Sequence, residues 1–380
     1  MSKVKLGDVA IEHKETCKGS KDGYPIVGLE HLVSEEVTLT AWDEGSDNTF
    51  TKMFRKGNVL FGRRRAYLKK AAVAPFDGIC SGDITVIEAI PDRILPELLP
   101  FIIQNDELFD FAVGKSAGSL SPRVKWEHLK NYEFELPDMD KQRELAELLW
   151  AMDATKKSYQ KLIAATDELV KSQFMEQFII ETPYERTRLG DHISQIRGVS
   201  YKPVDLRPSL SEESVLLLRA NNISAGRINH DEVQYVAKEK VSTVQLIQAG
   251  DILMCASSGS LEHVGKAAIC LPSIEGETFG AFCKLIRPKG DLLPEYIAAY
   301  LETDEYREII MQLACGSNIN NLKTEHIDEL QIPTPPAEVQ EAFVSFLRQS
   351  DKSKFAVLNC SNLNLSGPQP IRISPATPLP

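Results

Sequence analysis

Two short segments in the first half of the chain concentrate cationic side chains of a kind that contacts nucleic acids. The segment 57–70 holds five Lys and Arg residues and no acid, and the segment 115–130 holds four against a single Glu. Guanidinium groups bind phosphates and pair with the two acceptors of guanine, while hydroxyls and ammonium groups position a nucleic-acid backbone. The predicted nucleic-acid contacts of this half are Arg63, Arg64, Arg65, Tyr67, Lys69, Lys115, Ser116, Ser119 and Arg123.

The second half offers uncharged polar side chains at comparable places. They follow an apolar stretch at 215–218, stand after a second one at 252–256, or lie in an Asn-rich loop. Asn pairs with adenine, although Asn-Asn is equally ordinary turn chemistry. The predicted contacts of this half are Arg219, Asn221, Asn222, Ser258, Ser260, Asn318, Asn320, Asn321 and Lys323. For all these segments the alternatives are a solvated charged strand edge and a flexible polar connector.

Motifs for catalysis are missing from the sequence. No P-loop is present, and the one Pro-Pro pair, Pro335-Pro336, is followed by Ala rather than by the aromatic residue of a methyl-transfer loop. Acidic residues are scattered and do not group as a two-metal site. We therefore predict a chain without catalytic or metal-binding residues, which is not itself an enzyme.

Composition limits the class of protein further. The chain has 380 residues, 43% of them hydrophobic, which is enough for two globular domains. Its apolar runs are too short for a bilayer and no secretory pattern is present, so we expect a cytoplasmic protein with no membrane partner. The net charge of −11 argues mildly against nucleic-acid binding, but the two basic segments can override that total.

An internal repeat predicts how these side chains are positioned. Leu6-Gly7-Asp8 recurs as Leu189-Gly190-Asp191, and Gly57-Asn58-Val59-Leu60 recurs as Gly250-Asp251-Ile252-Leu253. Further along, Pro137 and Gln142 recur as Pro335 and Gln340. Short apolar segments between Gly, Pro and Asp predict a β-rich domain in each half, and helical spacing predicts a helix over 95–113 and over 293–313.

The halves are joined by a long helical segment. No Pro or Gly occurs from 141 to 178, and apolar residues recur at spacings of three and four. Such a helix, roughly 57 Å long, needs a partner helix, which the segment after Pro336 supplies in antiparallel direction. The apolar seam between the two helices is predicted to contain Leu145, Leu148, Met152, Tyr159, Leu162, Leu169, Phe343, Phe346 and Leu347.

Two β-rich domains, each followed by a helix and carrying the duplicated blocks in this order, resemble the specificity subunit of type I restriction-modification enzymes. The resemblance covers Val4 to about Asn359 and rests on the ordered duplication of the blocks. It implies an α+β fold with a pseudo-two-fold internal repeat, in which two target-recognition domains are joined by antiparallel spacer helices. The expected divisions are 1–140 and 181–336 for the domains, 141–180 and 337–359 for the helices, the second one shortened, and 360–380 for an irregular tail.

The resemblance also implies partners and a function. In that family each domain reads part of a bipartite, asymmetric duplex DNA target, and two methyltransferase subunits and the motor-nuclease restriction subunits join the complex. No cofactor is expected in this chain, whereas S-adenosylmethionine, ATP and Mg are implied for the partner subunits. The alternatives are a non-catalytic protein-interaction scaffold, which the acidic charge would suit, and a DNA binder that cannot assemble the full complex.

Overall fold

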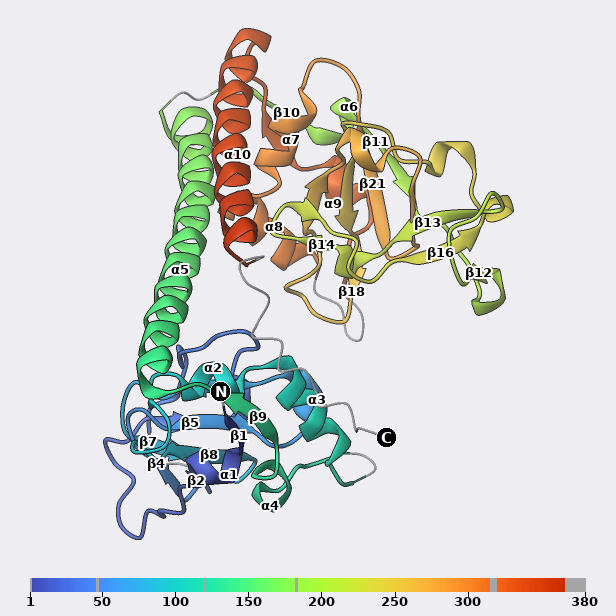
Figure 1. Cartoon of the computed structure of the whole chain (residues 1–380). Helices are drawn as coiled ribbons and strands as arrows, with labels where there is room; N and C mark the ends of the chain where they lie inside the picture. The colour runs from blue at the N-terminus through green and yellow to red at the C-terminus, as the bar shows by residue number, and fades with distance from the viewer. Residues whose placement is uncertain (1, 46–47, 119–120, 182–183, 315–319, 366–380) are drawn as a thin grey trace. The chain divides into compact units, whose positions relative to one another are not determined.

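A computed structural model describes residues 2–45, 48–118, 121–181, 184–314 and 320–365, with the side chains of 320 and 355–365 excepted. Ser119 and Asn318, both predicted contacts, and the expected tail from 366 onward lie outside these ranges. The chain forms two compact units (Figure 1). Among the described residues, unit 1 contains those up to 159 and those from 359 to 365, and unit 2 contains those from 160 to 358.

Unit 1 is built on a four-stranded antiparallel sheet. Its strand order is β2 (Ala10–Glu12), β8 (Ile84–Ala89), β5 (Val59–Gly62), β6 (Ala71–Val73). A smaller sheet has the order β3 (Ile26–Val27), β7 (Gly78–Cys80), β4 (Lys52–Phe54), and β1 (Ser2–Lys5) pairs with β9 (Glu133–Leu136). The helices are α1 (Leu6–Val9), α2 (Leu99–Ile103), α3 (Asp106–Gly114) and α4 (Trp126–Leu129).

Unit 2 repeats this plan. Its main sheet has the order β11 (Ile193–Arg197), β21 (Cys283–Pro288), β17 (Ile252–Cys255), β19 (Ala267–Ile269). The second sheet has the order β12 (Leu206–Arg207), β16 (Gln234–Ala237), β13 (Ser214–Leu218), β20 (Thr278–Phe279). Three short pairs are β10 (Arg186–Arg188) with β23 (Gln331–Pro333), β14 (Ile223–Ser224) with β15 (Arg227–Ile228), and β18 (Ser257–Ser258) with β22 (Asn320–Asn321). The helices are α6 (Leu189–His192), α7 (Pro294–Tyr300), α8 (Asp304–Leu313) and α9 (Thr324–Asp328).

The predicted α+β fold and its internal repeat are confirmed. Corresponding strands of the two main sheets occupy the same places in the same order, and all neighbours are antiparallel. The Leu-Gly-Asp blocks have a packing reason. A Cβ on Gly7 would lie 3.0 Å from the Cβ of Lys130, and one on Gly190 would lie 2.7 Å from the Cβ of Asp328. Only glycine lets this turn approach the end of α4 in unit 1 and the end of α9 in unit 2 so closely.

The helices expected over 95–113 and 293–313 are each broken into two. The second helix of each pair begins with its own cap, because the side chain of Asn105 accepts a hydrogen bond from the Glu107 N–H and Thr303 accepts one from the Tyr306 N–H. A capping side chain satisfies N–H groups that a continuous helix would satisfy with carbonyls. Polar residues between apolar ones therefore marked a helix start that the apolar spacing alone did not reveal.

Two long helices complete the described chain. Helix α5 (Met139–Met175) continues through a π-helical turn at Glu176–Ile180, and α10 (Ala337–Leu365) extends six residues past the end expected at Asn359. A buried glutamine joins the start of each helix to its domain. The side-chain oxygen of Gln142 accepts the Leu95 N–H at 2.8 Å, and that of Gln340 accepts the Leu293 N–H at 2.9 Å. The glutamines matched in the sequence repeat thus have the same structural role.

The interface between α5 and α10 in unit 2 differs from the predicted seam. The two helices lie side by side (Figure 1), and the ring of Phe174 packs 5.5 Å from that of Phe343. Val170, Phe174 and Phe178 enter the core of unit 2, as do Phe343, Phe346 and Leu347. Leu145 instead packs into the core of unit 1. Met152 and Tyr159 are half-buried, and Leu148, Leu162 and Leu169 are about half exposed.

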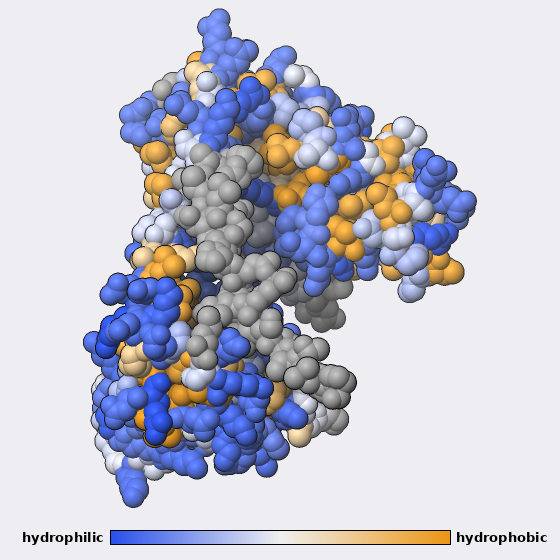
Figure 2. Space-filling view, viewed as in Figure 1, coloured by the Kyte–Doolittle hydropathy of each residue, from blue (hydrophilic) through white to orange (hydrophobic). Residues whose placement is uncertain are grey.

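This exposure contradicts a seam through Leu148, Leu162 and Leu169. The helix turns its aromatic side chains to the domain, because Phe174 and Phe178 bury more apolar surface than leucines would. An ion pair also joins the helices, between buried Lys354 on α10 and Asp167 on α5. The visible face of each unit is mostly hydrophilic, with apolar side chains in small patches (Figure 2). Within the described ranges, none of the helices combines the length and apolar character needed to cross a bilayer.

Candidate nucleic-acid interface

Three separate segments of unit 1 meet at the ends of β5 and β8. We call this place junction 1 and define it as residues 63–68, Asp83 and residues 121–124. The Arg63 N–H donates to the Asp83 carbonyl at 3.0 Å, and the Val124 N–H donates to the Arg63 carbonyl at 2.9 Å. An antiparallel bridge pairs Arg64 with Arg123. The two basic segments predicted from the sequence therefore come together here.

Asp83 organises the arginines of junction 1. Its carboxylate accepts two hydrogen bonds from Arg123, from Nε at 2.7 Å and from a terminal nitrogen at 3.1 Å. A terminal nitrogen of Arg64 lies 3.6 Å away, and the Arg64 Nε donates to the Ser121 hydroxyl at 2.6 Å. These contacts hold two guanidinium groups side by side at the surface, where 39% and 42% of their side chains are exposed. Four arginines against one aspartate leave junction 1 cationic.

The loop after Arg64 has a strained backbone. Arg65 and Lys69 both adopt the left-handed region, with φ of 53° and 50°, on either side of a short 3-10 turn. Non-glycine residues in this region cost free energy and are often found at functional sites. Between them Tyr67 is 54% exposed and Leu68 is 43% exposed. The loop therefore presents an aromatic and an aliphatic side chain next to the arginines.

Unit 2 contains the same junction with different side chains. Junction 2 consists of residues 256–260, Phe282 and residues 320–322. The Ala256 N–H donates to the Phe282 carbonyl at 2.9 Å, and the Leu322 N–H donates to the Ala256 carbonyl at 2.9 Å. Strand β18 pairs Ser257 with Asn321 and Ser258 with Asn320. These bonds reproduce those of junction 1, with Ser257, Phe282 and Asn321 in the places of Arg64, Asp83 and Arg123.

The chemistry of the two junctions is consequently unlike. Junction 2 contains no ionisable side chain. Its serines are half-buried, Asn321 is exposed, and Phe282 leaves 65% of its surface to solvent. One backbone frame therefore carries a cationic surface in unit 1 and a neutral surface with an exposed ring in unit 2.

The other predicted contacts lie around these junctions or away from them. Lys69 pairs with Asp106 at 2.6 Å, Lys115 stands over the ring of Phe111, and the Ser116 hydroxyl donates to the Ala112 carbonyl. In unit 2, Ser260 follows β18 and exposed Lys323 precedes α9.

Arg219, Asn221 and Asn222 belong to a turn after β13. Exposed Asn221 stays a predicted contact, while a terminal nitrogen of Arg219 donates to the Glu232 carbonyl at 2.8 Å. Asn222 is fully buried, and its side-chain oxygen accepts the Arg219 N–H at 2.9 Å. For Asn222 the turn alternative is therefore correct, because a buried amide that satisfies its own backbone has no exposed surface for DNA.

Sequence reasoning missed Asp83, Ser121 and Phe282. Asp83 and Phe282 each stand one residue before a strand of the main sheet, Ile84 and Cys283 being the first strand residues. Single residues at strand ends carry no motif. The signal available in the sequence was positional: both residues occupy the same place in the repeat and differ completely in chemistry.

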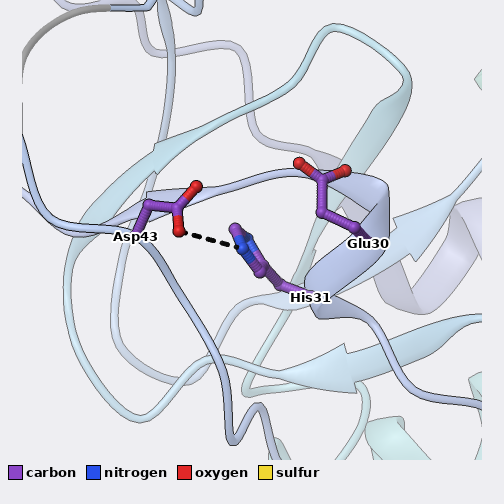
Figure 3. Close-up of side chains that lie close together, drawn as sticks. All are labelled: Glu30, His31 and Asp43. Carbon is purple, nitrogen blue, oxygen red and sulfur yellow. Dashed lines mark ion pairs between the residues drawn. The ribbon is translucent and has the colours of Figure 1, made fainter. Parts of the chain in front are cut away.

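A group of metal-ligand types also occurs in unit 1. Among the described residues, Glu30, His31 and Asp43 bring ligand atoms within 4.8 Å of one another (Figure 3). The Gly28 N–H donates to the Nδ1 of His31 at 3.0 Å, so the ring proton belongs on Nε2, which faces Asp43 at 3.5 Å. This bond matches the cap made by Asn222 in unit 2. His31 therefore acts as a turn cap, and we assign no metal site here.

The ion pair of junction 1 has a pH signature. The hydrogen bond from Arg123 holds the pKa of the Asp83 carboxyl below its ordinary value, against a smaller opposing effect of burial. Because the folded pKa lies below the unfolded one, the stability from this pair is complete above about pH 4 and is lost as the pH falls through the folded pKa. In Arg123→Met we expect the Asp83 titration midpoint, followed by carboxyl NMR, to rise.

The control for this titration is Asp138 in unit 1. Its pKa is also lowered, mainly by a hydrogen bond from the Lys141 backbone rather than by an arginine. The Asp138 midpoint should be the same in both proteins. An unchanged Asp83 midpoint in Arg123→Met would contradict the role given to Arg123.

A duplicated β-rich unit, with one surface junction in each copy and a long helix after each, defines a two-domain protein with an internal repeat. The chain belongs to the family described as type I restriction modification DNA specificity domain, whose model matches residues 1–165 and 219–364. It is similar to the specificity subunits of the type I restriction enzymes StySPI of Salmonella potsdam and EcoKI of Escherichia coli K12. Each is 37% identical over 163 residues, which cover 42% of this chain and 35% of the relative.

The alignments with these two relatives therefore span about a third of the relatives' length. Over nearly the whole chain, the fold is similar to the S subunit of a type I restriction-modification system from M. genitalium. That similarity covers 96% of this chain and 94% of the other, with a TM-score of 0.50 and 12% identity. At this identity the likeness concerns the fold alone.

Proposed function

We propose that this chain selects a bipartite, asymmetric duplex DNA target, with unit 1 recognising one half-site and unit 2 the other. The observation that supports this is the pair of junctions, which share their backbone hydrogen bonds and differ in their side chains. Two linked binding modules bind more tightly than either alone, because the second contact becomes intramolecular. Two half-sites of different base sequence require different side chains at equivalent backbone positions, which is what the two junctions provide.

The proposal includes partner subunits that carry the chemistry. Two methyltransferase subunits would use S-adenosylmethionine, and the motor-nuclease subunits would use ATP and Mg, while this chain supplies recognition without catalysis. Leu148, Leu162 and Leu169 are about half exposed, and the successive spacings between them on α5 are fourteen and seven residues. That spacing puts them near one face of the helix, where an apolar partner surface would cover them.

The first test is co-expression with a type I methyltransferase subunit in a methylation-free host, followed by mapping of methylated bases. We expect a two-part motif with a fixed gap and unlike halves. Two identical halves would contradict the different roles of the junctions.

A second measurement separates DNA binding from the scaffold alternative, which the net charge of −11 favours. Affinity for duplex DNA should fall steeply as salt rises, since cationic side chains release counterions from the phosphates. Salt-sensitive binding without any methylation would identify a DNA binder that does not assemble the complex. Absence of both results would favour the scaffold.

A further inference from the structure

Resting on the proposed function, we propose that Arg123 recognises a guanine in the half-site of unit 1 and that Asp83 is its positioning residue. The backbone of Arg123 is fixed on both sides. Its N–H donates to the Ala117 carbonyl at 3.0 Å, its carbonyl accepts the Ala117 N–H at 3.1 Å, and it pairs with Arg64 across the bridge. The side chain therefore leaves a rigid position.

The carboxylate of Asp83 occupies one edge of the Arg123 guanidinium and leaves the other available. Hydrogen bonds from Nε and one terminal nitrogen use two of its five N–H donors. The edge formed by the two terminal nitrogens still has parallel N–H groups in a fixed geometry. A side chain held by its inner edge can present this outer edge to a ligand without first losing rotamer entropy.

Guanine is the base that fits such an edge. In the major groove it presents two acceptors, O6 and N7, on the same base, and the forked guanidinium pairs with both. A phosphate also accepts two hydrogen bonds from arginine. However, the carboxylate of Asp83 would lie close to that phosphate and repel it, whereas it would meet no such charge beside a base edge. The pair therefore favours a base over the backbone.

Junction 2 cannot recognise guanine in this way. Phe282 and Asn321 occupy the places of Asp83 and Arg123, so no forked cation is present and no carboxylate orients one. An exposed ring fits the thymine methyl group, and an Asn side chain pairs with adenine. The guanine requirement at this position should consequently occur in one half-site only.

The experiment compares methylated motifs made by four versions of the full chain, each co-expressed with the methyltransferase subunit. They are the unaltered chain, Arg123→Lys, Asp83→Asn and Arg55→Lys. Lysine keeps the charge and removes the fork. Arg55 is the matched control, because it lies in the turn between β4 and β5, outside junction 1, has a side chain 41% exposed against 42% for Arg123, and pairs with Glu15 and Asp77.

We expect the unaltered motif to require guanine at one position that Arg123→Lys relaxes. Discrimination there should fall by about ten- to hundredfold, the value of one good bidentate contact. Asp83→Asn should relax the same position by less, because its amide keeps one acceptor for Arg123. The opposite half-site should stay unchanged in both, and Arg55→Lys should reproduce the unaltered motif.

Several outcomes would overturn this assignment. One is an Arg123→Lys chain that methylates an unchanged motif at a lower overall level, as a purely structural ion pair would produce. Another is a relaxed position that is not guanine, or different positions relaxed by the two variants. If Arg123→Lys fails to fold in a thermal unfolding control, Asp83→Asn decides the question by the same criterion. Absence of any two-part motif in the unaltered chain would instead refute the proposed function.

Discussion

Replacing Phe174 by alanine is expected to lower the free energy of unfolding of unit 2 by about 3–5 kcal/mol, the range for a buried aromatic ring. Phe174 is fully buried, and its ring lies 4.9 Å from that of Phe178, 5.2 Å from Tyr296 and 5.5 Å from Phe343. Its removal leaves a cavity between α5, α7 and α10 that rigid aromatic neighbours cannot fill.

The matched control for Phe174→Ala is Leu169→Ala on the same helix. Leu169 is 53% exposed, so its truncation should change stability by no more than about 0.5 kcal/mol. Urea unfolding followed by circular dichroism measures the loss. The three tryptophans, Trp42, Trp126 and Trp150, all belong to unit 1, so their fluorescence follows that unit separately. Equal losses for the two variants would mean that the aromatic cluster does not join α5 to unit 2.

A second large effect is expected at Asp251, where Asp251→Ala should cost unit 2 about 3–5 kcal/mol. Asp251 is 2% exposed, and its oxygens accept hydrogen bonds from Arg287 at 2.8 and 2.7 Å and from the Gln248 N–H at 2.8 Å. Alanine would leave the partly buried guanidinium of Arg287 without its partner. The free-energy cost of that unpaired charge is larger than the net stabilisation that the intact ion pair provides. Urea unfolding of unit 2 measures this change too.

The variant Asp251→Asn gives unit 2 the residue type that unit 1 has at the equivalent position, where Asn58 stands. At the equivalent turn Asn58 accepts the Arg55 N–H at 2.9 Å without a charged partner. We expect a loss smaller than that of alanine, because the amide oxygen can still accept the Gln248 N–H, although the charge and one of the two acceptors opposite Arg287 are lost. A loss below about 1 kcal/mol for Asp251→Ala would show that Arg287 is adequately solvated without the aspartate.

The prediction of the duplicated fold succeeded because the matched residues carry backbone requirements. Gly7 and Gly190 permit a close approach to the backbone or side chain of a neighbouring helix end. Gly57 and Gly250 adopt φ of 88° and 87° in the turn that leads into β5 and β17. Such positions accept few residue types. The matched residues therefore occur in the same order in both halves, although the surface residues of the halves differ. The presence of two similar units could therefore be predicted from the sequence.

The seam between the helices was predicted less well, for a physical reason. Apolar spacing on a long helix shows that one face is apolar, but it does not show which neighbour covers that face at each turn. The same helix packs into the core of unit 1 through Leu145 and into the core of unit 2 through Phe174. Leu148, Leu162 and Leu169 continue the spacing and are left exposed.

The sequence by itself determined the repeat, the α+β class, the long helix and the cationic character of the first unit. These follow from local patterns of residue size, polarity and charge. Only the tertiary structure decided which charges meet, because Arg64, Asp83 and Arg123 are brought together by hydrogen bonds between strand ends distant along the chain. Pairing of strands is a long-range event that local patterns do not encode. For that reason only the tertiary structure showed that Asp83 is the partner of Arg123. It also showed that Phe282 and Asn321, both uncharged, hold the equivalent positions in unit 2.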